Sequence, residues 1–72
     1  MQPGAYLKIL RIDCGISLED LALKSGYSRR YLREIEAGTK TPELFALRCI
    51  ATAITEEGRK RIMRKFLGEE AS

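Results

Sequence analysis

Histidine and tryptophan are absent from this sequence of 72 residues, and only two cysteines, Cys14 and Cys49, are present. Without histidine, the chain cannot assemble a Cys-His nucleophile, and two cysteines are too few for a zinc site. We expect both cysteines to be small buried apolar side chains. The sequence leaves a single disulfide between them open, but nothing else in it indicates an oxidising compartment.

A phosphate-binding glycine loop is also missing, and a chain of this size has little room to enclose an acid-base pair in a pocket. We therefore expect a protein that is not an enzyme and that uses no metal, cofactor or small-molecule ligand. No apolar run approaches the roughly 18 residues of a membrane span, and no basic segment leads into an apolar one at the N-terminus. These absences predict a soluble cytoplasmic protein that does not enter a membrane.

The hydrophobic content of 44% is sufficient for one small domain, which we place at residues 1–72. The chain contains no repeats, low-complexity tracts or linkers. Only its two ends, Met1 to Pro3 and Gly68 to Ser72, have the composition of frayed segments.

The net charge of +3 is small for a chain with 13 basic and 10 acidic residues, but its distribution is uneven. The window from Lys24 to Lys40 contains five basic and two acidic residues, so it alone has the net charge of the whole chain. A polyanionic partner would therefore bind in this window.

Helical spacing of apolar residues predicts an all-α fold, a compact bundle of five short helices. The first helix runs from about Gly4 to Cys14, begins after Pro3 and ends at Gly15. Its apolar positions are Tyr6, Leu7, Ile9, Leu10 and Cys14.

The second and third helices are separated by a tight turn at Gly26. Ser17 is the expected N-cap of the second helix, with Asp20 completing a shortened capping box, and Ser28 is the expected N-cap of the third, which ends at Gly38. Small Ala22 lets the two helices cross closely, and Gly26 supplies a positive φ. Residues 17–37 are therefore predicted to form a helix-turn-helix.

Pro42 opens the fourth predicted helix, and Thr55 with Glu56 and Glu57 starts the fifth. The apolar positions of the fourth helix are Leu44, Leu47, Ile50, Ala51 and Ile54. The fifth is amphipathic, with an apolar side of Ile62, Met63, Phe66 and Leu67, which we expect to be a dimer contact.

Two segments, "LKILRIDCGISLEDLALKSGYSRRYLREIEAG" and "TPELFALRCIATAI", resemble the Cro/repressor-type helix-turn-helix family over about Tyr6 to Ile54. The resemblance implies a lambda repressor-like fold and a transcriptional regulator, expected to act as a repressor, that binds double-stranded DNA. Such a regulator binds a palindromic operator as a homodimer, with the helix at residues 28–37 in the major groove.

The same resemblance implies roles for single residues. Arg29, Arg30 and Glu34 match base-contacting positions, whereas Ser17, Ser28 and Lys40 match positions near backbone phosphates. Arg11 and Glu36 match a partly buried salt bridge between the first and third helices. Two positions depart from the family pattern: Leu18 replaces a phosphate-contacting glutamine, and Ser25 replaces a larger apolar residue, which implies a looser or differently filled core.

The chemistry of these residues agrees with the resemblance. Arginine donates two parallel hydrogen bonds to guanine, and glutamate accepts one from cytosine. Arg30 and Glu34 are four residues apart and share a helix face, where they either contact neighbouring bases or pair with each other. Arg33 and Tyr31 are further backbone-contacting candidates, although Tyr31 would equally well cover the junction between the helices, and Tyr27 is expected in the core.

Two functional classes fit this pattern. The first is a sequence-specific DNA-binding regulator, and the second is a protein-interaction module, for example antitoxin-like, on the same scaffold. The outward face of the third helix distinguishes them, because a protein interface favours apolar residues there and a DNA interface favours residues such as arginine.

Overall fold

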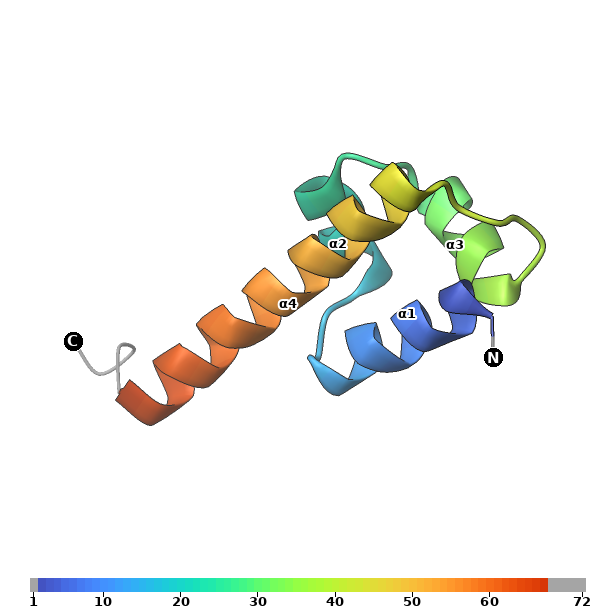
Figure 1. The fold of residues 1–72 in the computed structure, drawn as a ribbon. Coiled ribbons are helices and arrows are strands. Elements are labelled where there is room, and N and C mark those ends of the chain that lie inside the picture. Colours follow the sequence, from blue (N-terminus) through green and yellow to red (C-terminus); the bar gives the residue numbers. More distant parts are fainter. Residues whose placement is uncertain (1, 68–72) are drawn as a thin grey trace.

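A computed structural model describes residues 2–67, and in this range it contains four helices and no strand (Figure 1). The helices are α1 (Pro3–Asp13), α2 (Leu18–Ser25), α3 (Arg29–Ala37) and α4 (Leu44–Leu67). The all-α class is confirmed, but the count of five helices is wrong, because α4 spans both of the last two predicted helices. Met1 and Gly68 to Ser72, expected to fray, lie outside the described residues. Pro3, also expected to fray, is the first residue of α1, where its missing N–H has no intrahelical partner to lose.

The residues expected to start a fifth helix have other roles inside α4. Thr55 donates its hydroxyl to the carbonyl of Thr52 at 3.1 Å, and Glu57 forms ion pairs with Lys24 on α2 and Lys60 on α4. Gly58 does not interrupt the helix. It lies where α1 approaches α4, and a Cβ there would come within 2.6 Å of the Cys14 sulfur. The glycine is therefore explained by a close helix crossing.

The predicted caps of the second and third helices agree closely with the structure. The Ser17 hydroxyl accepts the N–H of Asp20, and the Ser28 hydroxyl accepts the N–H of Tyr31, each at 3.0 Å. Gly26 and Gly38 follow α2 and α3 with φ of 83°, the left-handed conformation that glycine adopts without steric cost.

The core lies where the first half of α4 packs against α1 and α2, and α3 packs against both of these helices. Its fully buried members are Leu21, Leu32, Ile35, Ile50 and Ile54. The contact of α1 with α3 is so close that a Cβ at Gly4 would overlap the backbone oxygen of Ile35.

Some residues expected in the core are exposed instead. Tyr6 and Leu44 lie mostly in solvent and Ile9 is 47% exposed, because only one narrow side of α1 and one of α4 face the core. Cys14 and Cys49 are half-buried free thiols, so the disulfide that the sequence left open does not form. No helix within residues 2–67 has both the length and the apolar character needed to cross a membrane.

The two halves of α4 have different surroundings (Figure 1). The first half lies against the other helices, whereas the second half projects beyond them, and every residue from Arg59 to Leu67 is exposed. At 24 residues, α4 is about 36 Å long.

Candidate nucleic-acid interface

The turn between α2 and α3 fixes the orientation of α3. The N–H of Gly26 donates to the carbonyl of Ala22 at 3.0 Å, which closes α2. Leu21 on α2 and Leu32 on α3 are both buried in the same core, so the two helices are joined by packing as well as by the chain. The prediction of a helix-turn-helix at about residues 17–37 matches this arrangement, which holds one side of α3 inward and presents the other to solvent.

Three arginines occupy the exposed side of α3. Arg29, Arg30 and Arg33 all lie in solvent, and the side chain of Arg30 is 86% exposed. Glu34 is half-buried at the edge of this side. No large apolar residue of α3 is exposed, since Leu32 and Ile35 are in the core.

Two of the three arginines form ion pairs in the free protein. Nε of Arg30 lies 3.3 Å from Oε2 of Glu34, and Nη1 of Arg29 lies 3.5 Å from Oε2 of Glu19 on α2. The sequence allowed Arg30 and Glu34 either to contact neighbouring bases or to pair with each other. In the free protein they pair with each other. Exposed pairs of this kind are worth about 0–1 kcal/mol and open at little cost. Arg33 has no ion pair with any residue in the range 2–67. The partner Glu19 was missed from the sequence, because it is ten positions from Arg29.

Lys40 lies beside α3, in the segment that follows it. Its ammonium is 3.6 Å from Oε1 of Glu34 and 5.5 Å from the ring centroid of Tyr31. The Tyr31 ring in turn stacks on Tyr27 with 5.2 Å between centroids. Tyr31 therefore covers the helix junction, as one of its two predicted roles required, and its ring also lies below a cation. Burial raises the pKa of Tyr27, which agrees with its predicted packing against the core.

Ser17 and Ser28 stand at the N-termini of α2 and α3. Each hydroxyl accepts a backbone N–H as a helix cap, so each has a structural role in the free protein. A helix N-terminus also presents unpaired backbone N–H groups, which suit a phosphate oxygen. Contact of either serine with DNA backbone stays a prediction.

The implied salt bridge between Arg11 and Glu36 is present. Nε of Arg11 donates to Oε2 of Glu36 at 2.7 Å, Nη2 donates to Oε1 at 3.0 Å, and Nη1 donates to the carbonyl of Ile16 at 2.8 Å. The two side chains are only 13% and 9% exposed. The hydrogen bonds that Arg11 donates to Glu36 raise the pKa of Arg11 despite its partial burial. This bidentate pair ties α1 to the C-terminal end of α3.

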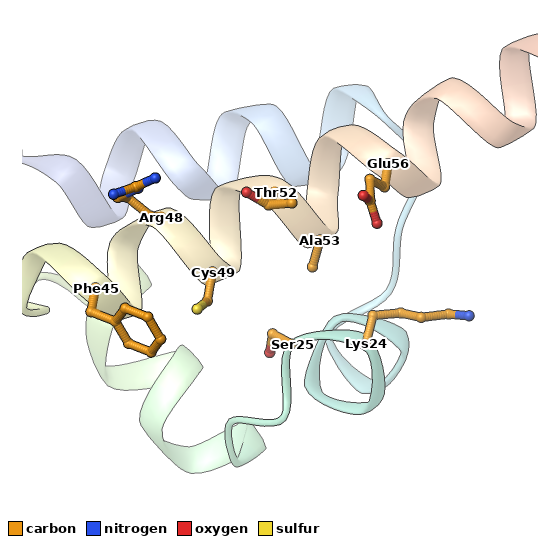
Figure 2. Close-up of a pocket in the computed structure, with 8 residues that line it drawn as sticks. All are labelled: Lys24, Ser25, Phe45, Arg48, Cys49, Thr52, Ala53 and Glu56. Atoms are coloured by element: carbon orange, nitrogen blue, oxygen red, sulfur yellow. The ribbon is translucent and has the colours of Figure 1, made fainter.

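The departure at Ser25 has a visible consequence. An open groove of about 420 Å³ lies between the end of α2 and the first half of α4 (Figure 2). Cys49 and Ala53 on α4 point towards Ser25, and the ring of Phe45 stands at one end, 69% exposed. The serine leaves unfilled the space that a larger apolar residue would occupy. Phe45 was missed from the sequence, because its place outside the apolar series of α4 gave no signal of its own.

At the other departure, Leu18 packs against the core from the start of α2. It offers no donor to a phosphate. Among residues 2–67, no group of three or more His, Cys, Asp or Glu side chains could hold a metal ion.

A family model described as helix-turn-helix matches residues 7–54, which is more than half of the chain and includes α2, the turn and α3. No curated protein and no solved structure matches the chain significantly.

Proposed function

We propose, from the premise that this chain belongs to the Cro/repressor-type helix-turn-helix family, that it binds one operator sequence with α3 in the major groove. Family membership supports DNA binding and transcription regulation as the general role. The finer proposal is that the chain acts as a repressor on a palindromic operator.

The observation that carries this proposal is the exposed side of α3. Three arginines lie there on a helix held rigidly by its core contacts, by its Ser28 and Gly38 caps and by the Arg11–Glu36 pair. We assign base contacts to Arg29, Arg30 and Glu34. We assign contacts with the DNA backbone to Ser17, Ser28, Tyr31, Arg33 and Lys40. The absence of exposed large apolar residues on α3 favours DNA over a protein partner.

Glu34 has a second task in this scheme. It pairs with both Arg30 and Lys40, so it holds two cations at the edge of the exposed side before DNA arrives. When Arg30 donates to a guanine, Glu34 becomes available to accept from a neighbouring cytosine.

The operator is bound by a homodimer in this proposal, because one α3 contacts too few bases for useful specificity. The half-site centres then lie about one helical turn, roughly 34 Å, apart. The exposed apolar residues of the second half of α4, Ile62, Met63, Phe66 and Leu67, support a dimer contact there.

Selection of bound duplexes from a random pool tests the proposal as a whole. We expect a palindromic motif. An absence of enrichment at low salt would instead favour the protein-interaction module.

Substitutions on α3 and beside it then separate base contact from backbone contact. Arg30→Ala is expected to cost about 1–3 kcal/mol on the selected site and to relax one base position, with little change on a scrambled duplex. Lys40→Ala is expected to weaken binding to both duplexes alike and to reduce the salt slope by about one unit. Titrations of both variants against both duplexes at several salt concentrations measure this.

Two controls remove the ambiguity that the ion pairs create. Adding Glu34→Ala to Arg30→Ala removes the carboxylate that Arg30→Ala leaves without its arginine. A loss in the double variant no smaller than in Arg30→Ala shows that the loss does not come from an unpaired Glu34. Arg30→Lys keeps the charge but not the two parallel donors, and it should lose the base preference while retaining the salt slope. Equal losses on both duplexes for Arg30→Ala would mean that Arg30 contacts only the backbone.

A further inference from the structure

The outer face of α4, the side turned away from the core, has an unusual order of residues. One helical line along it passes, in steps of three or four residues, through Phe45, Arg48, Thr52, Glu56, Arg59, Met63 and Phe66. Its four polar members all lie in the middle, and apolar residues lie at its two ends. Leu44 adjoins one end, and Ile62 and Leu67 adjoin the other.

Contacts on the opposite side show that residues 2–67 leave this face uncovered. Arg61 lies on the body side of the helix, where its guanidinium is 3.7 Å from the Asp20 carboxylate of α2. Ile50, Ile54 and Gly58, which precede Arg61 along the same side, are buried. The end of the outer face in the second half of α4 therefore points away from α1, α2 and α3, and Phe66 is 79% exposed. At the other end, Phe45 borders the groove beside α2 and is 69% exposed.

We propose that a second copy of this chain covers the outer face, with the two α4 helices antiparallel, so that Met63 and Phe66 of each lie over the Phe45 end of the other. The groove between α2 and α4, which is open beside Phe45 and Ser25, receives the Phe66 ring of the second copy (Figure 2). The two-fold axis passes near Thr55. This inference rests on the homodimer of the proposed function and names the surface that completes it.

Charge decides between the antiparallel and the parallel order. Arg48, Glu56 and Arg59 form no ion pair with any residue in 2–67. A parallel pairing would place each of them against its own copy, which is three like-charge encounters. The antiparallel order avoids the Arg48 and Arg59 encounters and leaves only Glu56 beside its own copy, at the two-fold axis. It also brings Glu56 of the other copy within about one helical turn of each Arg59.

Size and helix stability support the same arrangement. Buried aromatic side chains contribute about 150–250 Å² each, so two phenylalanines and four aliphatic residues approach the roughly 800 Å² per partner of a standard interface. In addition, residues 59–67 have little tertiary support, and an isolated helix of fewer than about 12 residues is marginal in water. A second copy supplies the missing support.

Cysteine cross-linking tests the order of the helices. In the full chain with Cys14→Ala and Cys49→Ala, we introduce Thr55→Cys, beside the axis, or Leu67→Cys, far from it. Mild oxidation should cross-link Thr55→Cys to itself, leave Leu67→Cys mostly uncoupled, and join Leu67→Cys to Leu44→Cys when the two are mixed. Faster self-coupling of Leu67→Cys than of Thr55→Cys would overturn the antiparallel order.

Mass measurements test the surface itself. Phe45→Asp and Phe66→Asp each place a charge in the interface, and because both side chains are exposed in the single chain, helicity should be retained. The dimer dissociation constant is expected to rise about 30-fold or more for each. Ile12→Asp, at an exposed apolar site on α1, is the matched control and should leave the dimer intact. A dimer unaffected by Phe45→Asp would refute the proposal that the groove binds the Phe66 ring of the second copy.

DNA binding separates this inference from the proposed function. If the surface is as proposed, Phe45→Asp binds a single half-site with unchanged base preference while its mass is monomeric. If selection yields no motif but the cross-links form as expected, the pairing stands and the DNA-binding proposal fails. If a motif is found and Thr55→Cys does not cross-link, the DNA-binding proposal stands and the pairing fails.

Discussion

The two halves of α4 form one continuous helix, but the first half packs against the other helices and the second half does not. In the first half, Ile50 and Ile54 are almost completely buried, and α1 and α2 pack against them. In the second half, residues of similar apolar character, including Ile62 and Phe66, are exposed. Amphipathic character thus indicates that a helix face will be covered, but it does not indicate which chain covers it.

The largest expected difference between the halves concerns core packing. Ile54→Ala should lower the free energy of unfolding by about 3 kcal/mol, because the side chain is 0% exposed and its loss leaves a cavity. Ile62→Ala, at a position 59% exposed, should change the stability of the monomer by less than about 0.5 kcal/mol. Urea unfolding at low protein concentration measures both, and equal losses would show that the projecting half has intramolecular support.

An intermediate effect on stability is expected when a charge in a partly buried ion pair is removed, compared with an exposed charge in the second half of α4. Glu36→Ala leaves Arg11 partly buried without its carboxylate and should cost about 2–3 kcal/mol. Lys65→Ala in the projecting half should change stability by less than about 0.5 kcal/mol. The double variant Arg11→Met, Glu36→Ala should recover part of the loss, because it removes the unpaired charge. A double variant as unstable as the sum of its single variants would mean that the pair is not coupled.

The smallest effect is a dependence on pH. Burial raises the pKa of Glu57, but the charges of Lys24 and Lys60 together outweigh it, so the pKa in the folded chain is below the ordinary value. A lowered pKa adds stability above the unfolded value of about 4.3, and this contribution is lost as the pH falls through the folded value. Glu57→Gln should therefore flatten the acid limb of a stability profile measured from about pH 7 to pH 3.

Glu56→Gln is the matched control for this measurement. Glu56 is the neighbouring residue, lies in solvent and forms no ion pair with any residue in 2–67, so its substitution should leave the acid limb unchanged at low protein concentration. A flattened limb for Glu56→Gln alone would contradict the assignment of the ion pairs to Glu57.

Local signals predicted the helix-turn-helix well. Ser17, Ser28, Gly26 and Gly38 act through backbone groups within a few residues of themselves, so each has the same role in the sequence pattern and in the structure. The Arg11–Glu36 pair is a contact between distant residues, and only the family resemblance indicated it. The base and backbone contacts assigned on α3 stay predictions, because they depend on a partner.

The prediction of a helix break at Thr55 was wrong because a helix start and a helix interior share the same residue types. Threonine followed by two glutamates is typical of a first turn, but here Glu57 is held by Lys24 on another helix. No local pattern contains that contact. Similarly, Gly58 resembles a breaker until the approach of α1 is known.

The sequence by itself determined the helix-turn-helix, because caps, turn glycines and apolar spacing act over three or four residues and need no distant contact. The tertiary structure alone decided that α4 is continuous, that Phe45 borders an open groove, and that the apolar side of residues 62–67 faces away from the body. Each of these depends on where another helix lies, and the helical period of one segment contains no information about its distance from the next.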